Sequence, residues 1–284
     1  MSDEGKARPA ALIDRLADPR PLIMGVLNVT PDSFSDGGRF TEREAAQDHA
    51  AAMVAAGADI IDVGGESTRP GSTGVSAETE AERVLPQLEA LADASCPVSI
   101  DTSKPAIMAA AAEAGVSLIN DVNALRADGA IEMVARLGLP VCLMHMQGEP
   151  RTMQANPVYN DVVREVGDFL IARMAACAQG GIARERILVD PGFGFGKTLE
   201  HNVTLLAHLD ELVARLACPV LVGMSRKRMI GALIGDAPVE ERLHGSVGAA
   251  VVAALKGARV IRVHDVAATH QALAVVNAVQ GVEA

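Results

Sequence analysis

The sequence of 284 residues has no tryptophan, one tyrosine and only five phenylalanines, and its 25 lysines and arginines are outnumbered by 36 aspartates and glutamates. A nucleic-acid surface needs a basic stripe, usually with aromatic side chains on which bases stack, so this composition argues against one. No apolar run approaches the roughly 18 residues of a membrane helix. We therefore expect neither nucleic acid nor a membrane among the partners of the chain.

Cysteine is also scarce: Cys96, Cys142, Cys177 and Cys218 lie far apart and form no Cys-x-x-Cys pair. We interpret them as reduced, mostly buried small hydrophobic residues rather than a disulfide framework or a zinc site. The first six residues are polar and lack the apolar core of a secretory signal, which makes the cytoplasm the expected compartment. The length and the apolar share of 49% indicate a globular chain with a substantial core.

What the sequence does contain is a repeating unit, in which a short run rich in Val, Ile and Leu is followed by a longer Ala-rich segment. The expected strands are residues 22–27, 59–63, 98–101, 117–121, 141–145, 187–190, 220–224 and 259–263. The expected helices are residues 42–56, 78–92, 106–114, 130–137, 162–179, 203–216, 247–256 and 267–279. This alternation predicts right-handed crossovers and a parallel sheet.

Eight such units in about 250 residues suit a closed (β/α)8 barrel, the TIM barrel, with eight parallel strands and outer helices, better than an open doubly wound sheet. No linker rich in Pro, Gly or Ser divides the chain. We therefore predict one domain over residues 21–284, preceded by a poorly ordered lead-in of residues 1–20.

Polar residues end nearly every predicted strand, where the chemistry of such a barrel takes place. They are Asn28, Asp62, Asp101, Asn120, Asp121, His145, Asp190, Arg262 and His264, with Lys227 shortly after the seventh strand. Arg262 and His264 are two apart and share one face of a strand, which suggests an anion site. Each residue alone has a simpler explanation: Asp101 could cap the helix that Pro105 begins, and His145 could be a hydrogen-bonded core group.

Aromatic rings are concentrated in two glycine-rich loops, at Phe34 and at Phe193 and Phe195. We interpret these rings as walls of a flat apolar binding slot. Residues 192–198 look like a phosphate-binding loop, but Pro191 occupies the position of its first glycine, so this interpretation fails. The sequence shows neither Gly-x-Ser-x-Gly nor His-Glu-x-x-His, which argues against serine hydrolase and zincin chemistry.

Several long motifs together carry a resemblance to a known family. They are MGVLNVTPDSFSDGG (24–38), GESTRPG (65–71), IDTSKP (100–105), INDV (119–122), DPGFGFGK (190–197) and RVHDV (262–266). In this order, over nearly the whole chain, they resemble the dihydropteroate synthases of the pterin-binding family. The resemblance implies a (β/α)8 barrel, usually a homodimer, that condenses 6-hydroxymethyl-7,8-dihydropterin pyrophosphate with 4-aminobenzoate to 7,8-dihydropteroate and pyrophosphate in folate biosynthesis. It also implies a target of sulfonamides, which compete for the aminobenzoate position.

The resemblance further implies roles for single residues. For the pterin pyrophosphate these are Thr68, Asp101, Asn120, Asp190, Lys227, Arg262 and His264, and the catalytic members are Asp101, Asp190, Lys227, Arg262 and His264. For 4-aminobenzoate they are Phe34, Ser67, Thr68, Arg69, Pro70 and Phe193. Asn28 would be the Mg²⁺ ligand, with Asp36 as a second candidate. Asn123 departs from the family, many members of which carry a basic residue there.

The implied mechanism is dissociative: the C–O bond breaks first, and the amine then attacks the pterin cation. Two glycine-rich loops are expected to close over the bound pterin: one contains Gly37 and Gly38, and the other contains Gly64 and Gly65. Three alternatives stay open: a pterin-binding methyltransferase domain acting with methyltetrahydrofolate, a non-catalytic paralogue, and a barrel acting on another sugar or nucleotide phosphate. The methyltransferase would have no use for the Arg262-x-His264 pair or for a metal at Asn28.

Overall fold

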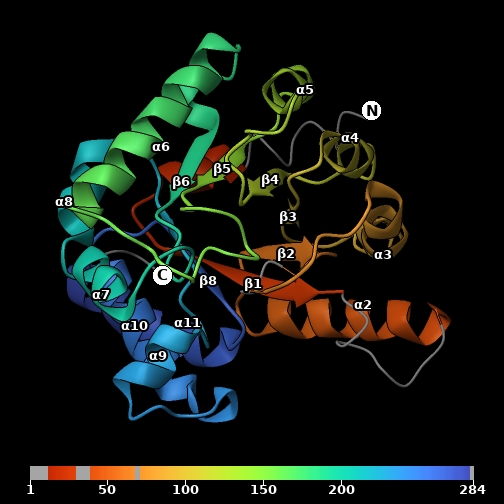
Figure 1. Ribbon diagram of the computed structural model, residues 1–284. Helices are drawn as coiled ribbons and strands as arrows, with labels where there is room; N and C mark the ends of the chain where they lie inside the picture. The colour runs from red at the N-terminus through yellow and green to blue at the C-terminus, as the bar shows by residue number, and fades with distance from the viewer. Residues whose placement is uncertain (1–11, 30–38, 68–70, 282–284) are drawn as a thin grey trace.

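The computed structural model describes residues 12–29, 39–67 and 71–281, with the backbone alone for residues 39–43. Eight parallel strands form one sheet in the order β6-β5-β4-β3-β2-β1-β8-β7. A bridge between Val189 and Val220 joins the two edge strands and closes the sheet into the predicted barrel (Figure 1). The strands are β1 (Leu22–Asn28), β2 (Ile60–Gly64), β3 (Val98–Asp101), β4 (Leu118–Asp121), β5 (Val141–Met144), β6 (Ile187–Asp190), β7 (Leu221–Val222) and β8 (Val260–Val263).

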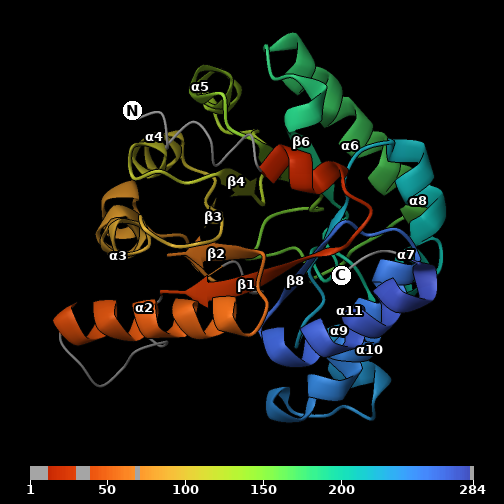
Figure 2. The ribbon, with the colours of Figure 1, turned by 180° about the vertical axis from the view of Figure 1, so that it is seen from behind.

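Helices surround the barrel on its outside (Figures 1 and 2). They are α2 (Arg39–Ala55), α3 (Ala77–Ala90), α4 (Pro105–Glu113), α5 (Ala130–Leu137), α6 (Val162–Gln179), α7 (Leu199–Ala207), α8 (Leu209–Leu216), α9 (Arg228–Leu233), α10 (Leu243–Leu255) and α11 (Val266–Gln280), with 3-10 turns η2 (Arg184–Arg186) and η3 (Val239–Glu241). In the described ranges, no helix is both long and apolar enough to cross a membrane.

Local signals in the sequence set most helix ends. The side chain of Ser76 accepts a hydrogen bond from the N–H of Thr79 at the start of α3, and Asp161 does the same for α6. Pro105 begins α4 with the fixed φ that a first helical turn requires. The predicted helix over residues 203–216 is in fact two helices, because the chain leaves helical geometry at His208.

Strand residues alternate between two apolar regions, as the period of two requires. Outward residues such as Ile23, Ile61 and Ile119 pack under the helices in the main core. Inward residues form a second cluster, which we call the inner apolar layer: Leu22, Met24, Ile60, Leu118, Cys142, Leu188, Leu221 and Val260. Because both faces of the barrel wall are covered, the strands are almost uniformly buried.

The amino end of the barrel is closed by a helix over residues 12–17, which lies across the strands in Figure 2. Its Leu12 and Leu16 are buried and belong to the same cluster as the inner apolar layer. The expectation of a poorly ordered lead-in is therefore wrong for residues 12–20. The leucines fill the barrel bottom, and this burial offsets the cost of ordering the segment.

Candidate active site

The barrel interior changes from apolar to polar within two residues on four of its strands. Ile60 is followed on the same face by Asp62, Leu118 by Asn120, Leu188 by Asp190, and Val260 by Arg262. Together with Asp101 at the end of β3, these polar residues form what we call the mouth layer: Asp62, Asp101, Asn120, Asp190 and Arg262. The carboxyl ends of the strands thus carry the convergent polar groups that the sequence predicted.

Arg262 is the centre of one half of the mouth layer. Its Nε donates to Asp62 Oδ2 at 2.6 Å, and its Nη2 donates to Asp101 Oδ2 at 2.9 Å. Burial alone would lower the pKa of the guanidinium, but the charges of Asp62 and Asp101 together hold it above its ordinary value. Burial raises the pKa of Asp101 to about 7, although Arg262 opposes this rise. Two carboxylates therefore share one partly buried cation.

Asp62 lies beneath this half of the site and is fully buried. Its Oδ2 also accepts a hydrogen bond of 3.2 Å from the Asn120 amide nitrogen, while its Oδ1 has no hydrogen-bond partner among the residues described. An ionised carboxylate accepts only, so Asp62 fixes which way the Asn120 amide faces. From the sequence, Asp62 is expected at the end of a strand but has no predicted role. Its spacing of two from the apolar Ile60 is the signal that would have placed it in the site.

Asp190 forms the other half of the mouth layer, and Lys227 lies beside it. The Asp190 Oδ1 accepts from the N–H of Gly192 at 2.7 Å, and burial raises the pKa of Asp190 while Lys227 opposes the rise. The Lys227 ammonium donates to the Phe193 carbonyl at 2.6 Å and lies 4.4 Å from the centre of the Phe195 ring. Burial lowers the pKa of Lys227 to about 8. The charge of Arg262 acts on both residues, so the two halves are one electrostatic unit.

His264 stands apart from Arg262, the residue with which it was predicted to share an anion site. His264 is exposed at the rim, where its Nδ1 lies 3.1 Å from the hydroxyl of Ser225. Arg262 is turned inward onto its two carboxylates. The two residues lie at different depths, because the acids of β2 and β3 attract the guanidinium, and the shared anion site stays a prediction.

The prediction that Phe193 forms a wall of an apolar binding slot is wrong. Its ring is fully buried in the main core and presents no surface to a ligand, while the ring of Phe195 is half-buried beside Met144 and Met146. Gly192 and Gly194 both have positive φ, which turns the chain so that the two rings face different regions. The sequence could not show which ring would enter the core.

The glycines that flank these rings, Gly192 and Gly196, serve close packing rather than phosphate binding. A Cβ on Gly192 would lie 1.8 Å from the His145 carbonyl oxygen, and one on Gly196 would lie 2.3 Å from that of Gln147. The rejection of a phosphate-binding loop is supported by the Lys197 ammonium, which is buried and lies 2.9 Å from His145 Nδ1. The expectation that His145 is a hydrogen-bonded core group is confirmed by the same contact.

The other predicted residues are placed as follows. Asp121 acts as a turn former, since it accepts from the N–H groups of Asn123 and Leu125. Ser67 is exposed after the end of β2. Five candidates lie outside the residues that the structure describes: Phe34, Asp36, Thr68, Arg69 and Pro70. The predicted closure of the loop after β1 also falls there, in residues 30–38.

Asn28 ends β1 beside the mouth layer. A Cβ on Gly64 would lie 3.7 Å from Asn28 Oδ1 and 3.8 Å from Asp101 Oδ2, so the glycine leaves space between two oxygen atoms. Within the described part of the chain, no group of three or more His, Cys, Asp or Glu side chains gathers for a metal. The oxygen donors at this point suit Mg²⁺, which takes few protein ligands and completes its shell with phosphate oxygens and water.

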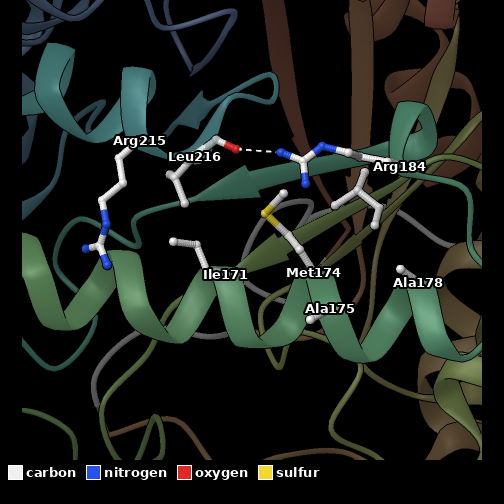
Figure 3. Close-up of a pocket in the computed structure, with 8 residues that line it drawn as sticks. Ile171, Met174, Ala175, Ala178, Arg184, Arg215 and Leu216 are labelled. Carbon is white, nitrogen blue, oxygen red and sulfur yellow. Dashed lines mark hydrogen bonds between the residues drawn. The ribbon is translucent and has the colours of Figure 1, made fainter.

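The cavity drawn in Figure 3 lies away from this site. It has a volume of about 320 Å³ and is lined by α6, η2 and α8, with Ile171, Met174 and Leu216 among its walls. One hydrogen bond, from Arg184 to the Leu216 carbonyl, crosses it at 3.0 Å. None of the described residues that line it is an acid or a nucleophile, so we place the chemistry at the mouth layer instead.

Comparisons with known proteins agree with this geometry. The model of the family described as pterin binding enzyme matches residues 24–264. The dihydropteroate synthase of Escherichia coli K12 is 54% identical over 259 residues, which cover 91% of this chain and 91% of that protein. Two Xanthomonas albilineans dihydropteroate synthase structures also match. The structure with 4-aminobenzoic acid has a TM-score of 0.87 and is 53% identical, and the match covers 93% of this chain and 94% of that chain. The structure with 7,8-dihydropteroate has a TM-score of 0.84 and is 50% identical, and the match covers 93% of this chain and 95% of that chain. The chain therefore belongs to the pterin-binding enzyme family and, within it, to the dihydropteroate synthases, a class of transferases.

Proposed function

We propose that the chain condenses 6-hydroxymethyl-7,8-dihydropterin pyrophosphate with 4-aminobenzoate to give 7,8-dihydropteroate and pyrophosphate. The observation that carries the proposal is the mouth layer, where three carboxylates, one amide and one guanidinium converge beside the Lys227 ammonium, in a family whose members bind the aminobenzoate and the product. The cytoplasmic location and the homodimer remain predictions from the sequence and its family likeness.

Recognition of the pterin follows from the hydrogen-bonding capacity of the mouth layer. The pyrimidinone edge of a pterin offers an amino group and a ring N–H as donors, and Asp190 and the Asn120 Oδ1 are acceptors. Because Asp62 holds the Asn120 nitrogen, the amide oxygen is the atom left for the ligand. Lys227 supplies a donor for the carbonyl or ring nitrogen of the pterin. A ring with a different edge would leave buried groups unpaired, at about 1–3 kcal/mol each.

The reaction needs no nucleophile from the protein. The bond between the pterin methylene carbon and the diphosphate oxygen breaks, and the electron pair leaves with the diphosphate. The aminobenzoate nitrogen then forms the new C–N bond and loses a proton. Asp101 and Asp190 stabilise the positive charge that spreads over the pterin, while Arg262 and His264 stabilise the diphosphate. A Mg²⁺ ion held at Asn28 would supply further positive charge for the leaving diphosphate.

A direct assay tests the proposal. The purified protein is mixed with the pterin pyrophosphate, 4-aminobenzoate and Mg²⁺, and dihydropteroate and pyrophosphate are measured. We expect both products in equal amounts, each dependent on the presence of 4-aminobenzoate. Absence of dihydropteroate, together with methyl transfer from methyltetrahydrofolate to a corrinoid, would instead establish the methyltransferase alternative.

A further inference from the structure

Lys197 ends the glycine-rich segment that follows β6, and the proposed reaction assigns it no role. Its ammonium is almost fully buried and has three partners: His145 Nδ1 at 2.9 Å, the Gly192 carbonyl at 2.9 Å and the Phe195 carbonyl at 3.0 Å. An ammonium has three N–H groups, so all of them are used, two inside the loop and one on His145, which follows β5. Lys197 therefore does not face a ligand.

We propose that Lys197 is a positioning residue for the pterin half of the site: it fixes the loop of residues 191–197 so that Asp190 and Lys227 keep their places at the barrel mouth. This inference rests on the proposed function, because the ligand that Asp190 and Lys227 receive is the pterin. The sequence of this loop is similar to that of a phosphate-binding loop, but its role here would be to position the pterin-binding residues.

The contacts show how Lys197 reaches these two residues. Gly192 is held on both sides, since its N–H donates to the Asp190 carboxylate and its carbonyl accepts from Lys197. Phe195 is held in the same way, with its carbonyl on Lys197 and its ring under the Lys227 ammonium. A single residue thus connects Lys197 to each of its targets: Gly192 contacts both Lys197 and Asp190, and Phe195 contacts both Lys197 and Lys227.

A second, uncharged restraint acts on the same loop. The Asn202 Oδ1 accepts from the N–H of Gly194 at 2.7 Å, and its amide nitrogen donates to the Thr198 carbonyl at 2.6 Å. Asn202 restrains the loop without adding charge, whereas Lys197 contributes both a restraint and a charge. The two residues therefore allow geometry and electrostatics to be separated.

Burial raises the pKa of Asp190, and the positive charge of Lys197 is one of the charges that oppose this rise. The other groups that face Asp190 are Lys227, Arg262 and the thiol of Cys142. His145 stays neutral, because burial and then Lys197 lower its pKa to about 2. Burial lowers the pKa of Lys197 to about 7, but a neutral amine still has two N–H groups for the two carbonyls. The restraint thus persists in both protonation states.

Steady-state kinetics test the positioning role with Lys197→Met and Asn202→Ala. The matched control is Lys256→Met, which removes an ammonium that also binds a carbonyl and a carboxylate, directly after the end of α10 and outside the barrel. We expect Lys197→Met to raise the KM for the pterin pyrophosphate about tenfold and Asn202→Ala to raise it about threefold, while the KM for 4-aminobenzoate changes by less than about twofold. Lys256→Met should leave both constants unchanged.

A spectroscopic titration adds a readout that loss of structure alone would not give. In protein labelled with ¹³C-aspartate, the carboxyl resonance missing from Asp190→Asn identifies Asp190. Its pKa should rise in Lys197→Met, because a nearby positive charge is lost, and should stay unchanged in Asn202→Ala. If Lys197→Met does not fold, Lys197→Gln replaces it, since the amide keeps two N–H donors without the charge.

Two kinetic outcomes would overturn the inference: a KM for the pterin pyrophosphate within twofold of the unaltered protein in Lys197→Met, or an equal rise in both KM values. An unchanged Asp190 titration would do so as well. If the unaltered protein makes no dihydropteroate, the proposed function fails by itself. The Asp190 titration would then still decide whether Lys197 acts on that carboxylate.

Discussion

Two buried acids three residues apart, Asp59 and Asp62, show how differently the two ends of the barrel are built. At the amino end, Asp59 accepts from Arg15, Arg20 and the N–H of Ile23, so both of its oxygens are satisfied. At the mouth, Asp62 is fully buried with one oxygen unpartnered among the described residues. The first arrangement stabilises the fold, whereas the second keeps hydrogen-bonding capacity unused.

This difference extends to the surroundings of the two acids. Around Asp59, the N-terminal helix and the inner apolar layer close the barrel with leucine and methionine side chains. Around Asp62, the pKa values of two carboxyl groups, Asp101 and Asp190, and of two cations, Lys227 and Arg262, depart from their ordinary ranges. Perturbed groups that converge in one place are typical of active sites. Substitutions at the two ends should therefore affect different properties.

The largest effect is expected at the mouth, from Asp190→Asn. The substitution keeps the shape of the side chain but removes the charge that stabilises the pterin cation, so turnover should fall by about 10²–10³. Thermal unfolding should change little. Dihydropteroate formation and the melting temperature measure the two quantities, and a near-normal rate would refute the role of Asp190. Arg262→Ala is a poorer test, because it also leaves Asp62 and Asp101 buried without their cation.

A smaller effect at the same end concerns pH. Burial raises the pKa of Asp101 to about 7, and only its ionised form stabilises a cation. Well below pH 7, kcat/KM for the pterin pyrophosphate should therefore fall about tenfold per pH unit. The same raised pKa makes the folded protein bind a proton more tightly than the unfolded chain, so this group's contribution to stability decreases as pH rises from about 4 to 7. A flat rate profile through neutral pH would contradict the assignment.

The smallest effect is expected at the amino end, from Asp59→Ala. Arg15 and Arg20 lose their shared acceptor and Ile23 its N–H partner, which should lower the free energy of unfolding by about 1–3 kcal/mol. The turnover of the folded protein should not change. Asp210→Ala, which removes an exposed acid paired with Lys256, is the control and should lower the free energy of unfolding much less than Asp59→Ala. Loss of turnover in Asp59→Ala without loss of stability would break the distinction between the two ends.

Much of the fold and the site could be predicted from local patterns. The predicted strands over residues 98–101 and 187–190 agree with β3 and β6, and the predicted helices over residues 130–137 and 162–179 agree with α5 and α6. Asp101, Asn120, Asp190, Lys227 and Arg262 were placed at one mouth because parallel strands bring their carboxyl ends together. These inferences need only short-range periodicity and the parallel arrangement.

Other features were beyond the reach of such patterns. Helix α9 has six residues, too few for a recognisable apolar period, and was not predicted. The break at His208 was also missed, since apolar residues continue across it. Leu12 and Leu16 gave no sign that they would close the barrel, because the cavity they fill exists only once the strands have assembled.

By itself, the sequence determined the eight strand–helix units, the polar strand ends and the membership of a pterin-binding family, since each is written in neighbouring residues. Only the tertiary structure decided that Asp62 holds Arg262, 200 residues away, that Phe193 rather than Phe195 enters the core, and that Lys197 turns inward. These choices depend on which partners meet when the barrel closes. Buried charges and N–H groups take the acceptors available there, and local sequence does not specify those partners.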